Sequence, residues 1–135
     1  MSNNIKSSQL TRLGYEYQDL LCIQLLIDWY HNPDKYHWIS IESSSVAGEK
    51  FQGLDDVIAL NSSNRYELYQ VKFTIDAQRD DLKLNFSWLC NKKDNGTSML
   101  QKWAKDVYKY GANNQLEKAI LVTNRIPDET FSQLL

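Results

Sequence analysis

The chain has 135 residues, of which 42% are hydrophobic and 24% charged, with four tryptophans and eight tyrosines. This composition supports one domain with a single core and excludes a disordered chain. The net charge of −2 argues against a protein that coats nucleic acid by charge alone. The most apolar segment, LLCIQLLI, is too short to span a bilayer, and the N-terminus lacks a signal-peptide pattern, so we expect a cytoplasmic protein without a membrane partner.

A long helix is the first predicted element. Apolar side chains recur at steps of three and four residues between positions 8 and 29, so we predict a helix that begins at Ser7 or Ser8 and ends before Pro33. Gly14 lies inside it and costs about 1 kcal/mol relative to alanine, so we expect it to permit a close backbone approach or to open space beside a site. The apolar residues that define this pattern are Leu10, Leu13, Tyr17, Leu20, Leu21, Leu25 and Trp29.

Three strands follow the helix. The segments 37–42 and 55–60 are predicted strands, joined by a polar connection over residues 43–53 that contains glycine. The third strand, residues 65–74, alternates between two faces that both carry apolar side chains. A strand with two mixed faces is covered on both sides, so we predict that it lies in the centre of the sheet.

The last part of the chain predicts a second helix, a fourth strand and the start of a third helix. Residues 97–110 form the second helix, capped by Thr97 or Ser98. The apolar run in residues 118–127 predicts a strand covered on both sides, and Pro127 with Asp128 begins the last helix. In the second helix we place Leu100, Trp103, Ala104 and Val107 inward and Lys102, Lys105 and Lys109 outward.

The order of these elements predicts the fold class. A helix, three strands, a helix, a strand and a helix give a mixed sheet flanked by helices, because a connection through a helix favours parallel placement of the fourth strand. We therefore predict one α/β domain over residues 1–135. Its last helix has little to bury where the sequence stops, so we expect the chain to be the N-terminal fragment of a longer protein.

Four polar residues at the ends of the predicted strands suggest a metal site. Asp56 begins the second strand, Gln70 and Lys72 lie two residues apart on the third, and Glu42 ends the first. Oxygen ligands of this kind suit Mg²⁺ or Mn²⁺, and a lysine beside them can orient water or stabilise a phosphate transition state. We predict that Glu42, Asp56 and Gln70 bind the metal and that Lys72 assists catalysis.

Simpler interpretations compete with each of these assignments. A single Gln-x-Lys pair is usually an ordinary polar strand face, and Asp55 with Asp56 is typical of a turn before a strand. The stripe of Lys102, Lys105 and Lys109 is usual for a solvated helix face, with contact to DNA phosphates as the alternative. The conjunction of these polar residues on three successive strands favours the site.

The order GYEYQ, IE, GLDDVIAL and YELYQVKF over residues 10–127 resembles the PD-(D/E)xK nuclease superfamily in its Gln-x-Lys variant. It is most similar to the N-terminal double-stranded DNA endonuclease domain of bacterial antiphage effectors, linked either to a CBASS sensor or to a STAND NTPase. The resemblance implies a restriction-endonuclease-like fold in which Asp56 binds metal, Gln70 holds an acidic position and Lys72 is the motif lysine.

The resemblance also names secondary candidates. Asp55 is a neighbour that could replace Asp56, and Gln18 takes a possible role as ligand or water-positioning residue. Glu49 is an alternative to Glu42, which we prefer because a strand end is more rigid. Glutamine at an acidic position favours a single-metal mechanism.

The resemblance implies a Mg²⁺- or Mn²⁺-dependent endonuclease that cuts double-stranded DNA with little sequence preference. In the intact protein, a C-terminal sensor or NTPase domain would activate it and drive formation of a homo-oligomer. The alternative is a catalytically inactive nuclease fold that binds nucleic acid or a partner, motivated by Gln70 and by the acidic composition.

Overall fold

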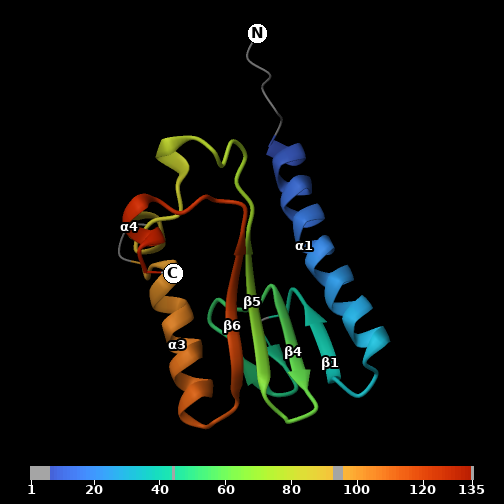
Figure 1. Ribbon diagram of the computed structural model, residues 1–135. Coiled ribbons are helices and arrows are strands. Elements are labelled where there is room, and N and C mark those ends of the chain that lie inside the picture. The colour runs from blue at the N-terminus through green and yellow to red at the C-terminus, as the bar shows by residue number, and fades with distance from the viewer. Residues whose placement is uncertain (1–6, 44, 93–95, 135) are drawn as a thin grey trace.

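The computed structural model describes residues 7–43, 45–92 and 96–134. The polar run NKKDNG at residues 91–96, whose sequence predicts an exposed loop, lies partly outside them. Four strands form one sheet in the order β1-β4-β5-β6, with α1 on one side and α3 on the other (Figure 1). The elements are α1 (Ser7–His31), β1 (Tyr36–Ile41), β2 (Ser45–Val46), β3 (Glu49–Lys50), β4 (Val57–Asn61), β5 (Tyr66–Lys72), a 3₁₀ turn (Asp80–Leu82), α2 (Phe86–Leu89), α3 (Met99–Ala112), β6 (Leu116–Thr123) and α4 (Glu129–Ser132).

The sheet is mixed, as the sequence predicts. β1 pairs with β4 and β4 with β5 in antiparallel fashion, whereas β6 pairs with β5 in parallel after the crossover through α3. β5 is therefore central, which confirms the prediction for residues 65–74. The fourth strand, β6, lies at an edge of the sheet among the described strands, yet its apolar residues pack on both faces, as predicted: Leu121 on the α3 side, with Ile120 and Val122 on the α1 side.

A small hairpin interrupts the connection that we predicted to be an irregular polar segment. β2 and β3 pair through Ser45 with Lys50 and Val46 with Glu49. Ala47 and Gly48 form the turn with positive φ angles of 51° and 81°. Two successive positive φ angles are the geometry of a tight hairpin turn, which allows only two residues between the strands.

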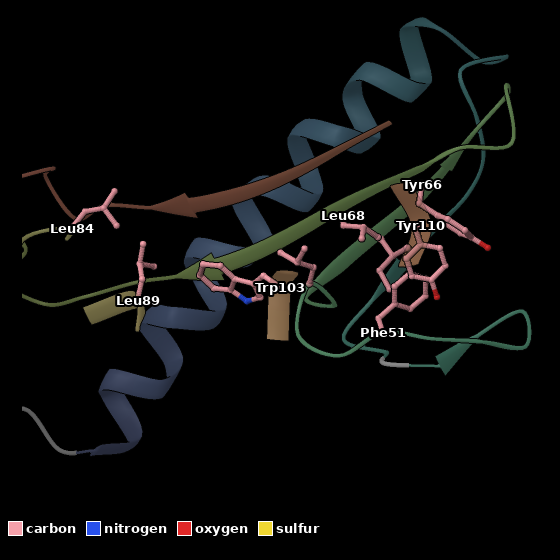
Figure 2. Packing of buried hydrophobic residues seen from close by; sticks show 9 residues of the cluster. Phe51, Tyr66, Leu68, Leu84, Leu89, Trp103 and Tyr110 are labelled. Atoms are coloured by element: carbon pink, nitrogen blue, oxygen red, sulfur yellow. The ribbon is translucent and has the colours of Figure 1, made fainter. Parts of the chain in front are cut away.

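Two apolar layers cover the two faces of β4 and β5, and they hold the strands in place. On the α3 side, the rings of Phe51, Tyr66 and Tyr110 pack together, with 4.8 Å between the centroids of Phe51 and Tyr110 (Figure 2). The smaller layer on the α1 side joins the helix to β4 and β5. Its buried members are Cys22, Leu25, Val57 and Tyr69.

The buried face of each long helix differs from the predicted one. α1 extends past the ends of β5 and β6 (Figure 1), and Leu10 and Leu13 near that end of the helix are exposed. Leu20 is exposed because it lies on the face of α1 opposite the buried Gln18 and Cys22. Among the described residues, no helix is both long and apolar enough to cross a membrane. α1 buries Gln18, Cys22 and Leu25, and α3 buries Trp103, Asp106 and Tyr110 while Leu100, Ala104 and Val107 face solvent.

Candidate active site

A cavity of about 320 Å³ lies between α1 and the strand ends that carry the predicted polar residues. The antiparallel pairing of Ile41 with Val57 places the end of β1 beside the start of β4, and the backbone N–H of Glu42 donates to the carbonyl of Asp56 at 2.9 Å. β5 ends at the same edge because it runs antiparallel to β4. The lining includes Gly14, Gln18, Glu42, Asp56, Lys72 and Phe73.

Asp56 is the most strongly constrained carboxylate of this cavity. Its Oδ2 accepts hydrogen bonds from the side-chain Nε2 of Gln70 and from the backbone N–H of Val71, both at 2.6 Å. Burial raises the pKa of Asp56, and the Val71 N–H bond and the positive charge of Lys72 offset this only in part. A desolvated carboxylate of this kind gains by binding a cation, which supplies the charge that water no longer screens.

Gln70 contacts Asp56 but does not line the cavity. Since an ionised carboxylate only accepts hydrogen bonds, the amide NH₂ of Gln70 must face Asp56, and its carbonyl Oε1 points elsewhere. That oxygen is buried and has no hydrogen-bond partner among the described residues. A buried acceptor without a partner costs free energy unless a cation or a donor satisfies it.

The oxygen donors at this edge fit a hard divalent cation. Glu42 and Asp56 line the cavity with two carboxylates, which suit Mg²⁺ or Mn²⁺. Gln70 presents its NH₂ to Asp56, so its unpartnered Oε1 would become a third donor only after the amide rotates. Within the described part of the chain, no group of three His, Cys, Asp or Glu side chains could hold a metal. The proposed metal ligands therefore combine two carboxylates with one amide oxygen.

The structure places Glu42 in the cavity and Glu49 in contact with α3 instead. Glu42 lines the cavity, has a strained positive φ of 55° and accepts a hydrogen bond from the Nε2 of Gln18 at 3.2 Å. Glu49 instead accepts from the ammonium of Lys109 and the hydroxyl of Tyr110, each at 3.1 Å. Of the two candidates, Glu42 is the one in the cavity, together with Gln18.

The other predicted residues occupy different surroundings. Asp55 does not line the cavity; burial raises its pKa, and the positive charges of Lys72 and Lys102 counteract that rise. Lys105 is exposed. Lys109 is bound to Glu49 and so ties α3 to the small hairpin.

Asp106 supports the site but was not predicted from the sequence. Asp106 of α3 is fully buried and accepts hydrogen bonds from three successive backbone N–H groups: Gln52 at 2.7 Å, with Gly53 and Leu54 each at 3.1 Å. These bonds fix the loop that leads into Asp55 and Asp56. An available signal was its position three residues after Trp103 and four before Tyr110, on the face that packs against the sheet.

Comparison with known proteins assigns the chain to a class. A mixed α/β sheet with a cavity of carboxylates, amides and a lysine at one edge is a scaffold suited to an enzyme. A family model described as "Cap4, dsDNA endonuclease domain" matches residues 7–131. The chain therefore belongs to this family of double-stranded DNA endonuclease domains, which confirms the resemblance found in the sequence. No curated protein and no solved structure matches it.

Proposed function

We propose that this domain hydrolyses double-stranded DNA with the help of Mg²⁺ or Mn²⁺, using the cavity at the edge of the sheet. The observation that carries the proposal is the desolvated carboxylate of Asp56, which lines one cavity with Glu42 and Lys72 and contacts a glutamine with an unpartnered oxygen. The family assignment supports DNA as the substrate.

The roles follow from the chemistry of the donors. Glu42, Asp56 and Gln70 would hold the metal ion, which when bound neutralises phosphate charge and lowers the pKa of a water. Lys72 would stabilise the negative charge that develops on the phosphate, or orient the attacking water. Gln18 would position Glu42 through their hydrogen bond.

The biological setting is proposed from the resemblance. It supports a restriction-endonuclease-like PD-(D/E)xK fold and cutting with little sequence preference by a cytoplasmic antiphage effector. In the intact protein, the domain would be activated by a C-terminal sensor or NTPase domain and would then form a homo-oligomer. Contact of Lys102, Lys105 or Lys109 with DNA phosphates belongs to the same proposal, although the ion pair of Lys109 with Glu49 would compete with it.

Removal of either central side chain should abolish cleavage. We expect Lys72→Ala and Asp56→Ala each to reduce Mg²⁺-dependent conversion of supercoiled plasmid by about a thousandfold, the scale of losing one charge-stabilising group. Lys50→Ala, which removes an exposed lysine of the small hairpin, is the control and should cut normally. Undiminished cleavage by both site variants would exclude this cavity as the active site.

The alternative is a nuclease fold that binds nucleic acid or a partner without cutting it. The glutamine at an acidic position motivates it, because Gln70 provides one negative charge fewer to a metal. Thermal unfolding with and without Mn²⁺ separates the two functions. An active domain should be stabilised by Mn²⁺, and Asp56→Ala should lose that stabilisation. An inactive module should unfold at the same temperature in both conditions.

A further inference from the structure

Arg125 differs from the other arginines in forming no ion pair with a carboxylate of the described residues. The sequence has four arginines, and three of them form ion pairs: Arg12 with Glu16, Arg65 with Glu117 and Arg79 with Asp81. Among the described residues, no Asp or Glu lies within ion-pair distance of Arg125. Burial lowers its pKa, yet an arginine keeps its charge in proteins, so this half-buried positive charge has no counterion in the part of the chain that the structure describes.

The guanidinium of Arg125 is nevertheless held in a defined orientation. Its Nε donates to the hydroxyl of Thr74 at 2.9 Å, and its Nη1 donates to the carbonyl of Lys83 at 3.5 Å. The Trp88 ring covers one face, with 3.8 Å between the ring centroid and the guanidinium carbon. Because these contacts are neutral, they fix the group and leave its charge available for an anion.

The position of Arg125 places it next to the proposed active site. Thr123 pairs with Lys72 where β6 and β5 end side by side, and Arg125 follows two residues later at the same edge of the sheet. Arg125 itself lines neither the cavity of Asp56 nor a second cavity, but its Nε bonds to Thr74, two residues after Lys72. Its chain neighbours Asn124 and Ile126 line that second cavity, of about 650 Å³. Phe73 lines both this cavity and the one that contains Asp56, so the two adjoin.

We propose that Arg125 binds a backbone phosphate of the DNA strand, one that neighbours the phosphate cleaved in the adjoining cavity. This inference rests on the proposed function, because it takes DNA cleavage as the reaction. A planar guanidinium that is already oriented by Thr74 and Trp88 loses little entropy when it binds phosphate oxygens. Arg125 is thus a substrate-positioning residue that directs the strand past the ends of β6 and β5 towards Lys72.

The test is the salt dependence of DNA binding. Affinity of the intact chain for a short DNA duplex is measured in EDTA, so that cleavage does not interfere, over a range of salt concentrations. We expect Arg125→Gln to weaken binding at low salt on the order of tenfold, and to reduce the slope of log affinity against log salt by about one. Arg65→Gln removes the same charge from an arginine paired with Glu117 and is the matched control, with an unchanged slope.

A purely structural role for Arg125 gives a different result. If Arg125 only fastens the loop after β5 to the end of β6, Arg125→Gln will lower the unfolding temperature but leave the salt slope unchanged, and this overturns the inference. Should Arg125→Gln not fold, Arg125→Lys keeps the charge and removes the planar fork. We then expect weaker binding with a slope like that of the original chain, whereas unaltered affinity again overturns the inference.

The outcome is separable from that of the proposed function. If Lys72→Ala abolishes cleavage while Arg125→Gln leaves the salt slope unchanged, the active site stands and the phosphate contact fails. If Arg125→Gln reduces the slope while both site variants cleave normally, the phosphate contact stands and the proposed active site fails.

Discussion

Gly14 shows how a single residue serves the cavity. It lies inside α1 and lines the cavity, and a Cβ built there would meet no other atom within 4 Å. Of the two reasons predicted for a glycine at this position, open space beside a site agrees with the structure and a close backbone approach does not. The helix therefore accepts a residue of poor helix propensity where a side chain would enter the cavity.

Replacing this glycine should separate stability from activity. We expect Gly14→Ala to raise the free energy of unfolding by up to about 1 kcal/mol, because alanine favours the helix. The added methyl group narrows the cavity beside Asp56, so cleavage should fall severalfold. Gly111→Ala in α3, which also has open space around it, is the control. Plasmid cleavage and urea unfolding measure the two effects, and equal cleavage by both variants would contradict this role of Gly14.

The placement of three site candidates follows from strand geometry, while their roles stay predictions. Glu42, Asp56 and Lys72 line one cavity, and two-residue alternation and the ends of strands locate such side chains without knowledge of the tertiary packing. Arg125 and the unpartnered oxygen of Gln70 were missed, because the presence or absence of a partner depends on segments distant in sequence.

At the level of elements, α3 fastens the connection between β1 and β4. Asp106 binds the backbone of residues 52–54, and Lys109 and Tyr110 bind Glu49 in the small hairpin. Gly53 suits this contact, since a Cβ there would lie a tight 3.1 Å from the Cβ of Lys102. The helix therefore supports the segment that delivers Asp55 and Asp56 to the sheet.

Removal of the Asp106 carboxylate should destabilise the contact between α3 and residues 52–54. We expect Asp106→Ala to lower the free energy of unfolding by about 3 kcal/mol or more, because several buried backbone N–H groups lose their only charged acceptor. Asp34→Ala, at an exposed position, should change it by less than about 0.5 kcal/mol. Urea denaturation followed by circular dichroism measures both. A loss below about 1 kcal/mol for Asp106→Ala would contradict the role assigned to this contact.

Local signals predicted several elements well. Ser98 caps α3 as expected, in a capping box with Gln101, and Asp128 caps α4. The burial of Asp106 was missed because its position on the face of Trp103 and Tyr110 conflicts with the usual placement of an acidic residue in solvent, which holds unless a partner is known. The same limit explains the wrong inward placement of Leu100 and Val107: periodicity gives a spacing, and the tertiary contacts choose which face is covered.

At the scale of the whole molecule, the mixed sheet and its flanking helices were predicted because the order of elements restricts the topology. The extent of burial was not, because the sheet covers only one face of α1, and the pattern does not say which apolar residues lie on the other face. Leu20 and Ile23 stay exposed although buried residues of the same helix precede and follow them.

The pH dependence of global stability tests the tie between α3 and the hairpin. Hydrogen bonds from Lys109 and Tyr110 lower the pKa of Glu49, so its contribution to stability is present above its ordinary pKa and is lost as the pH falls through the lowered value. Glu49→Gln should therefore lower the unfolding temperature at about pH 7 and have much less effect at about pH 3. Thermal unfolding at both values checks this, and an equal loss at the two would contradict it.

The dependence of the Asp56 loop on Asp106 has a consequence for the synthesis of the protein. Every side chain proposed for the cavity precedes α3 in the sequence, whereas the acceptor that orders the loop lies within α3. While α3 is still inside the ribosome, the chain already contains all the proposed ligands, but Asp106 does not yet bind the loop that leads to Asp56. All residues of the proposed site are then synthesised before the site can adopt its folded geometry. We expect the site to form only after α3 has emerged and packed against the loop.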